Sequence, residues 1–342
     1  MFQIHGTSIT AEDLGSIVSV SNIEAFPSTR LDELWFEQSM FSQKVYVRFG
    51  LLAADTEFMF ADSAGAFIAS TFGWTTLSSD NLPFGGPIYP FASPGILVTV
   101  KPNDRLKLMT AVYDDNPVGK CAEALDPGQC NEDGLNFSWD DPALLLAEVD
   151  YSYNQNGARP GIIKIGGWHD WGKFADQCFD VSHGLQANTG RNPLLHNGTY
   201  GIYGIIDQVI YQVPGEDGRN VSVFARVIGS PSDRNQIDTY FDTGIVFTGM
   251  LPRRPNDVFG IGMAYTGISD DASAFDRDSG LSVIRNHEVL LEISYTAEIV
   301  PGWSLQPDFQ YIWNPGGNVP DETGTQPIKD AIVLGARTTL SF

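Results

Sequence analysis

The carboxyl-terminal segment 330–342 alternates between two kinds of side chain. One face of an extended strand would carry Ile332, Leu334, Ala336, Thr338, Leu340 and Phe342, and the other Val333, Gly335, Arg337, Thr339 and Ser341. A soluble sheet can alternate in this way, but it rarely combines a mid-strand arginine with a terminal phenylalanine. A transmembrane β-strand has both features, because one face meets lipid and the other meets a wet lumen.

The same two-faced pattern recurs along the chain. About fourteen such segments begin near residues 18, 29, 43, 94, 105, 145, 160, 200, 220, 239, 256, 286, 303 and 330. Most are about nine to twelve residues long, which lets a tilted strand cross a bilayer. Short connections such as 102–104 alternate with long ones such as 114–142. This sorting is typical of an outer-membrane barrel and is not expected of a β-sandwich.

Composition narrows the class of protein further. No apolar run in the 342 residues approaches the roughly 18 needed for a membrane helix, the longest candidate being ALLLA at 143–147. The formal net charge is −22, from 42 acidic and 20 basic residues, which argues against nucleic acid as a partner. Met1 is followed directly by FQIHGTSIT, without a secretory signal. We therefore expect the chain to lack its true amino terminus.

Charged and aromatic residues gather on the predicted lumen face. The mid-strand cations are Arg48, Lys107, Lys164, Arg226 and Arg337, and the mid-strand anions are Glu33, Glu37, Glu148, Asp150, Glu292 and Asp308. Trp35 shares a face with Glu33 and Glu37. Sugars bind through hydrogen bonds to charged groups and through stacking on aromatic rings, so this face can bind a sugar. Alternatively, the charges pair across the wall and stiffen it.

The segment 65–95 is a second candidate site, because it is rich in glycine, proline and aromatic residues. The aromatic residues are Phe67, Phe72, Trp74, Phe84, Tyr89 and Phe91. Folded into a barrel, so apolar a loop would narrow the pore and offer stacking surfaces. The alternative is a loop that caps the rim of the barrel.

The sequence contains no recognisable catalytic motif. Glu33 and Glu37 would lie about 13 Å apart along a strand, too far for a glycosidase carboxylate pair. The five histidines do not cluster with metal-ligand spacing, and no GxSxG, phosphate-loop or dinucleotide motif occurs. We expect no covalent chemistry, no cofactor and no metal centre.

The segment 114–141 is strongly acidic and is predicted to be an external loop. Either divalent cations bridge it to the outer leaflet or its charges are simply solvated. Cys121 and Cys130 lie within it and can form a disulfide in an oxidising compartment, although the sequence leaves this pairing open. Cys178 is then left as a free or buried thiol.

Several long stretches resemble the carbohydrate-selective porin family of Gram-negative outer membranes, the OprB-like porins. They are RLDELWFEQ (30–38), VRFGLLAADTEF (47–58), FGWTTLSSDNLPFGGPIYPFASPG (72–95), AVYDDNPVG (111–119), GIYGIIDQVIY (201–211), VFARVIGSP (223–231), QPDFQYIWNPGG (306–317) and AIVLGARTTLSF (331–342). The resemblance thus extends from about residue 30 to the carboxyl terminus.

The resemblance implies an antiparallel transmembrane β-barrel of 16 strands that passes sugars by facilitated diffusion. Its partners would be mono- or small oligosaccharides and outer-membrane lipid. Residues 1–342 would form one porin domain with about 14 of those strands, lacking the signal peptide and first strands. The implied pore residues are Arg30, Glu33, Trp35, Glu37, Arg48 and Trp74; Arg226 and Arg337 rest on their mid-strand position alone. A general or anion-preferring porin and a soluble sugar-binding β-protein remain alternatives.

Overall fold

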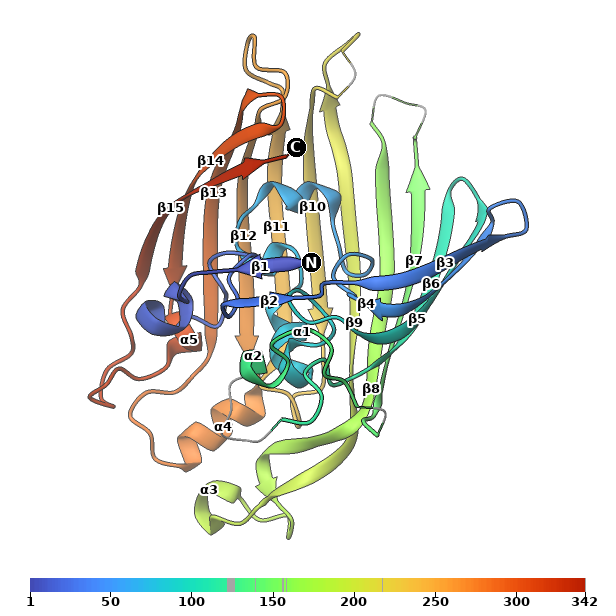
Figure 1. Ribbon diagram of the computed structural model, residues 1–342. Coiled ribbons are helices and arrows are strands. Elements are labelled where there is room, and N and C mark those ends of the chain that lie inside the picture. The colour runs from blue at the N-terminus through green and yellow to red at the C-terminus, as the bar shows by residue number, and fades with distance from the viewer. Residues whose placement is uncertain (122–126, 139, 156, 158, 217, 342) are drawn as a thin grey trace.

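The computed structural model describes residues 1–121, 127–138, 140–155, 157, 159–216 and 218–341. Among these residues, thirteen antiparallel strands form one sheet in which each strand pairs with its neighbours in the sequence (Figure 1). The strands are β3 (Leu34–Met40), β4 (Val45–Leu52), β5 (Ser93–Asn103), β6 (Leu106–Asp114), β7 (Ala143–Tyr153), β8 (Gly161–Asp180), β9 (Pro193–Gln212), β10 (Asn220–Gly229), β11 (Ile237–Thr248), β12 (Val258–Ile268), β13 (His287–Val300), β14 (Trp303–Trp313) and β15 (Ala331–Leu340).

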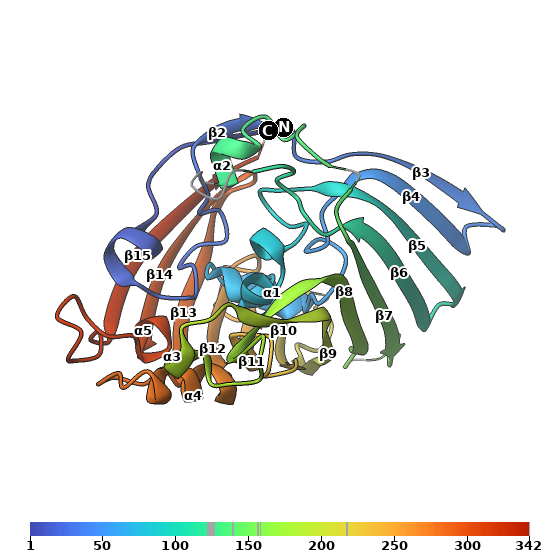
Figure 2. The ribbon, with the colours of Figure 1, turned by 90° about the horizontal axis from the view of Figure 1, so that it is seen from below.

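The sheet curls around a central space, which we call the lumen (Figure 2). Its two edges are β3 and β15, and no ladder joins these two strands within the described residues. The short strands β1 (Phe2–Ile4) and β2 (Ser28–Arg30) pair with each other and lie between the edges, together with α2 (Pro127–Cys130). The predicted all-β antiparallel architecture is confirmed.

The connections are sorted by length at the two ends of the sheet. At one end, the short-turn end, are turns such as 41–44, 104–105 and 301–302. At the other, the long-loop end, are connections such as 115–142 and 314–330, and the loop 53–92 also starts there. Among the described residues, no helix is long and apolar enough to cross a membrane.

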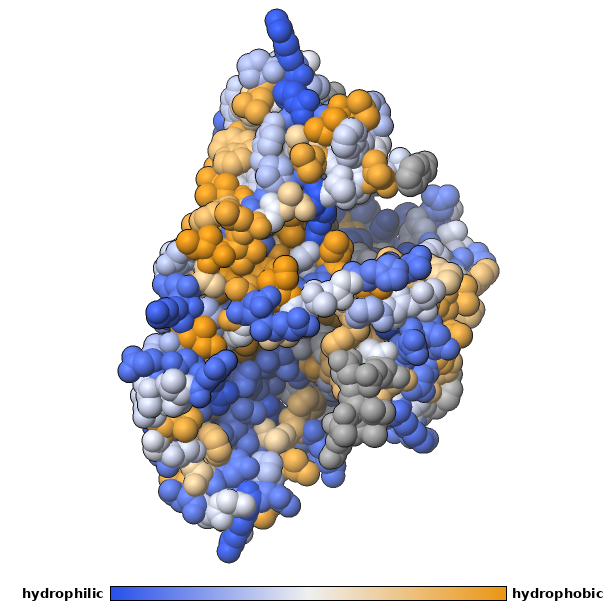
Figure 3. All heavy atoms as spheres, turned by 60° about the vertical axis from the view of Figure 1, so that its left-hand side comes forward, coloured by the Kyte–Doolittle hydropathy of each residue, from blue (hydrophilic) through white to orange (hydrophobic). Residues whose placement is uncertain are grey.

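The outer face of the sheet is apolar, as the alternation predicts. Ile332, Leu334 and Leu340 of β15 are exposed, while Arg337 lies on the other face. Apolar atoms form a band over the outer face on this side of the molecule (Figure 3). Exposed apolar side chains on other strands include Phe49, Ile96, Val112, Ile165, Ile202 and Phe241. Phe342, predicted to share this face, lies outside the described residues.

The strand predicted near residue 18 is wrong. Ile17 and Val18 form no strand; their backbone N–H groups donate to the carboxylate of Glu288 on β13, at 3.1 and 3.2 Å. Val18 is buried in the lumen. The backbone N–H groups of this segment are therefore paired with a side chain of the sheet and not with a neighbouring strand. A short alternating segment can be buried in this way without forming a β-ladder. The strand predicted near residue 29 begins at Leu34 in the sheet.

The connection 53–92 between β4 and β5 folds into the lumen. It contains the short helices η2 (Asp62–Ala66), η3 (Ser70–Phe72), α1 (Thr76–Asn81) and η4 (Pro83–Gly85). Its apolar side chains Phe58, Met59, Phe67, Phe72 and Leu77 are all buried. The remaining helices are η1 (Thr10–Leu14), α3 (Gln186–Thr189), α4 (Asp270–Asp278) and α5 (Pro315–Asn318). We call residues 53–92 the inward loop.

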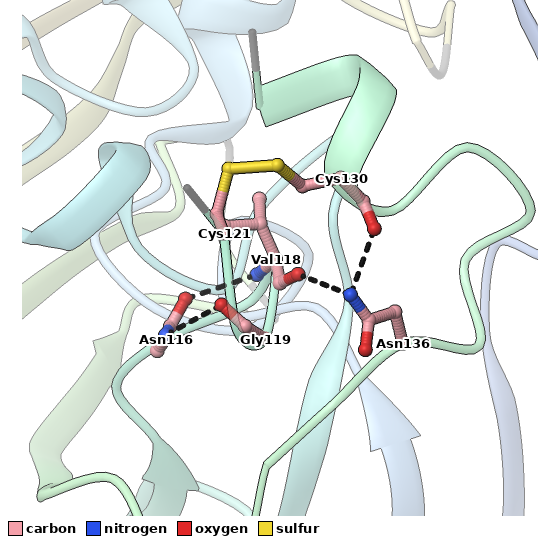
Figure 4. Close-up of a disulfide and its surroundings, with 6 residues drawn as sticks. All are labelled: Asn116, Val118, Gly119, Cys121, Cys130 and Asn136. Atoms are coloured by element: carbon pink, nitrogen blue, oxygen red, sulfur yellow. Dashed lines mark hydrogen bonds between the residues drawn. A yellow bond between two sulfur atoms is a disulfide. The ribbon is translucent and has the colours of Figure 1, made fainter. Parts of the chain in front are cut away.

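The acidic connection 115–142 contains the disulfide that the sequence left open, joining Cys121 to Cys130 (Figure 4). The Asn136 Nδ2 group braces it by donating to the carbonyls of Val118, at 3.1 Å, and Cys130, at 2.7 Å. Residues 122–126 and 139 of this connection lie outside the described residues. In the described part of the chain, no group of three or more His, Cys, Asp or Glu side chains is arranged to hold a metal ion.

Candidate functional site

Three wall carboxylates hold the backbone of the inward loop. Glu148 on β7 accepts a hydrogen bond from the Met59 N–H at 3.0 Å. Asp207 on β9 accepts from the Ser63 N–H at 2.7 Å, and Glu292 on β13 accepts from the N–H groups of Ile68 and Ala69 at 2.6 and 3.0 Å. An irregular loop leaves backbone donors unpaired, and burying them without partners is costly. These mid-strand anions therefore fix the path of the loop.

Arg226 on β10 does the same for the loop carbonyls. Its side chain is 1% exposed, and its guanidinium donates to Asp242 and to the carbonyls of Met59 (2.5 Å), Gly73 (2.8 Å), Thr71 (2.7 Å) and Phe72 (3.3 Å). Tyr240 completes the network, with its hydroxyl 2.8 Å from Asp242. The predicted pore residue Arg226 thus has its donors engaged within the loop–wall contact.

Lumen-facing glycines make room for the aromatic side chains of the loop. A Cβ atom at Gly262 would lie 2.8 Å from the rings of both Phe67 and Phe72. At Gly260 it would lie 3.0 Å from Phe67. The rings of Phe67 and Phe72 are themselves 4.4 Å apart. The two glycines of β12 therefore leave space on the inner wall, and the aromatic rings of the loop pack into this space.

An open cluster of charged and aromatic side chains lies on the inner face of β3 and β4. The Arg48 guanidinium lies 4.2 Å from the ring centroid of Trp35. It pairs with Glu37 at 3.0 Å and with Glu57 at 2.6 Å. Trp35 is 44% exposed, and the three charged side chains are only partly buried. We call these four residues the Trp35–Arg48 cluster.

The sequence identified three members of this cluster and missed the fourth. Glu57 comes from the inward loop, and its position in the stretch VRFGLLAADTEF was the only available signal. Glu33 lies nearby, where its carboxylate accepts from the Ala53 N–H at 2.8 Å and so holds the start of the loop.

The other predicted pore residues lie apart from the cluster. Arg30 is 1% exposed and covers the Phe91 ring at 4.3 Å. Trp74 is buried within the loop, where its indole N–H donates to the Gly85 carbonyl at 3.1 Å. Arg337 donates to the Ser21 hydroxyl and the Asn22 side-chain oxygen, at 2.9 and 2.6 Å, and so holds the amino-terminal segment against β15.

Two cavities open towards the short-turn end of the lumen. Their volumes are about 720 and 540 Å³, and Asp62, Ser152 and Ile162 line both. The smaller one contains the ion pair between Lys107 and Asp150, at 2.8 Å. Lys164 also lines it and donates to the Phe60 carbonyl at 2.6 Å. Polar, partly charged walls of this kind suit the passage of a hydrated solute.

Comparison with known proteins identifies similar chains. A model described as "Carbohydrate-selective porin, OprB family" matches residues 1–342. Porin B of Pseudomonas aeruginosa is 25% identical over 348 residues, spanning 96% of this chain and 72% of that protein. The putative porin QuiX of Acinetobacter baylyi is 21% identical over 63% of this chain and 48% of its own length. The high-pH structure of Pseudomonas putida OprB superimposes with a TM-score of 0.84 at 20% identity, covering 99% of this chain and 80% of that one.

Proposed function

Because the chain belongs to the carbohydrate-selective porin, OprB family of the outer membrane, we propose that it passes neutral mono- and small oligosaccharides by facilitated diffusion. The observation that carries the proposal is the Trp35–Arg48 cluster, which combines an exposed indole with a guanidinium and two carboxylates. Family membership implies a channel rather than an enzyme. The apolar outer face of the sheet would contact lipid.

The cluster offers the two kinds of contact that a sugar needs. The Trp35 ring can stack against the C–H face of a pyranose, and the carboxylates of Glu37 and Glu57 can accept from its hydroxyls. Arg48 is already held by both carboxylates, so little conformational entropy is lost when a sugar arrives. Partial exposure keeps the contacts weak, which passage requires, because the sugar must also leave.

The inward loop supports the proposal by restricting the lumen beside this cluster. Its hydrogen bonds to Glu148, Asp207 and Glu292 come from three widely separated strands. A loop fixed at so many points acts as a permanent constriction rather than as a mobile lid. Solutes would then have to pass close to Arg48 and Glu57.

Single-channel conductance in a planar bilayer, with glucose titrated in, tests the proposal. We expect a current that falls saturably with glucose, and a half-blocking concentration several-fold higher in the Trp35→Ala variant. Trp303→Ala is the matched control, since Trp303 is similarly exposed, at 42%, but lies on the outer face of β14. Current indifferent to glucose would reject a sugar site, and equal block in Trp35→Ala would place that site elsewhere.

A further inference from the structure

The smaller cavity at the short-turn end has an unusual charge. Its lining includes five cationic side chains, from Lys44, Lys101, Arg105, Lys107 and Lys164, and three anionic ones, from Asp62, Asp104 and Asp150. The whole chain has the opposite balance, with 42 acidic and 20 basic residues. Basic residues therefore gather at this one mouth of the lumen against the overall charge of the protein. We call this cavity the basic vestibule.

Part of this positive charge is unneutralised. Lys107 is paired with Asp150, and Lys164 donates to a loop carbonyl. Within the described residues, no ion pair neutralises Lys44, Lys101 or Arg105. These three side chains are exposed and come from two adjacent turns, 41–44 and 104–105, and the strand end between them. They are free to meet a solute.

The vestibule also contains sugar-binding groups. The Lys101 ammonium lies 5.0 Å from the ring centroid of Tyr46, which lines the same cavity. Ser152 on β7, which is half-buried, supplies a hydroxyl. A cation beside an aromatic ring, with a hydroxyl lining the same cavity, matches a ligand that is both polyhydroxylated and anionic.

We propose that the basic vestibule is a second subsite, which attracts and binds carboxylated sugars such as aldonates and uronates before they reach the Trp35–Arg48 cluster. The ligand carboxylate pairs with Lys101 and the fork of Arg105, and a ligand hydroxyl contacts Ser152. The inference rests on the proposed sugar passage and extends it to acidic sugars.

Electrostatic focusing makes the subsite effective at low ionic strength. A charged mouth with low-dielectric walls raises the local concentration of a counter-ion by a factor of ~10 or more. The Debye length falls from about 10 Å in 0.1 M salt to about 3 Å in 1 M salt, so the preference should weaken with salt. A neutral sugar should show no such dependence.

The test is block of single-channel current by gluconate and by glucose, in 0.1 M and 1 M KCl. For the unmodified protein we expect half-block by gluconate at a several-fold lower concentration than by glucose, with the difference reduced in 1 M KCl. The double variant Lys101→Gln/Arg105→Gln should raise the gluconate value about 5- to 10-fold and leave the glucose value within about twofold.

A matched control uses two exposed cations at the opposite end of the strands, in the double variant Lys329→Gln/Arg191→Gln. It should leave both half-blocking concentrations unchanged. Equal block by gluconate and glucose, or equal effects of the two double variants on gluconate, would overturn the basic vestibule. The proposed sugar passage has a separate test: it would be rejected if glucose did not block the current of the unmodified protein.

Discussion

Arg226 and Asp242 lie directly opposite each other on β10 and β11, and form a buried ion pair on the inner wall of the lumen. The arginine uses its remaining donors to hold four carbonyls of the inward loop. Asp242 accepts from the guanidinium and so holds it aimed at the loop. This ion pair of the wall thus acts together with Glu148, Asp207 and Glu292 to fix the path of the inward loop.

Arg226→Met should release the inward loop. We expect a larger single-channel conductance and a weaker glucose block, because the loop loses four hydrogen bonds. Stability should fall by about 3–5 kcal/mol, since Asp242 is left as a buried unpaired charge. The double variant Arg226→Met/Asp242→Leu removes that charge and should recover much of the stability but not the narrow pore. A double variant with normal conductance would show that Arg226 does not set the constriction.

A larger residue in place of a β12 glycine should also displace the inward loop. Gly262→Val places a side chain against the Phe67 and Phe72 rings, and overpacking of this kind costs about 1–3 kcal/mol. We expect the folded species, seen as the fast-migrating band of an unboiled sample on a gel, to unfold at a lower temperature. Gly204→Val is the control, because nothing lies within 4 Å of its added Cβ. An equal fall of the unfolding temperature in both variants would show that the effect comes from replacing a strand glycine and not from contact with the loop.

The sequence predicted the wall better than it predicted the site. Period-2 alternation assigns each strand residue to one face, so the inward positions of Arg48, Arg226 and Arg337 were readable. Alternation cannot tell which inward-facing charged side chain remains exposed to the lumen and which is buried by the loop. Arg226 meets the carbonyl of Thr71, which is 155 residues away in the chain, whereas Arg48 meets Glu57 only nine residues away. The long-range path of the loop decides between burial and exposure.

The same limit explains the error near residue 18. Val18 and Val20 alternate with polar neighbours as strand residues do, but their N–H groups are satisfied by Glu288 and the Thr10 hydroxyl. Nothing local in the sequence distinguishes these partners from a neighbouring strand. Trp74 likewise looks in the sequence like a residue on which a sugar could stack. In the structure its ring is buried in the inward loop, and its indole N–H donates to the Gly85 carbonyl.

Arg48→Lys tests whether the geometry of the guanidinium matters in the Trp35–Arg48 cluster. Lysine keeps the charge but cannot bridge Glu37 and Glu57 with a planar fork while stacking on Trp35. We expect the half-blocking glucose concentration to rise about 3- to 10-fold, equivalent to ~1 kcal/mol, with little change in conductance. Arg219→Lys, on a turn outside the cluster, should leave the glucose block unaltered. A glucose block unaffected by Arg48→Lys would indicate that only the charge contributes.

Asp55 gives the inward loop a dependence on pH. Burial raises the pKa of this carboxyl to about 6, opposed by the hydrogen bond that it accepts from the Tyr89 N–H. One of its oxygens is buried without a hydrogen-bond partner. Since the folded pKa exceeds the ordinary value of 3.8, the folded loop is most stable below about pH 4, and this contribution is lost as the pH rises through about 6.

Hydrogen exchange of the loop amides between pH 4 and pH 7.5, corrected for intrinsic exchange, measures this contribution. Protection in the unmodified protein should decrease as the pH rises through about 6. Asp55→Asn, which keeps the shape and removes the titration, should flatten the profile over the same range. Glu12→Gln, an exposed change in the amino-terminal segment, should leave the slope intact. An equally steep profile in Asp55→Asn would assign the pH dependence to another group of the lumen.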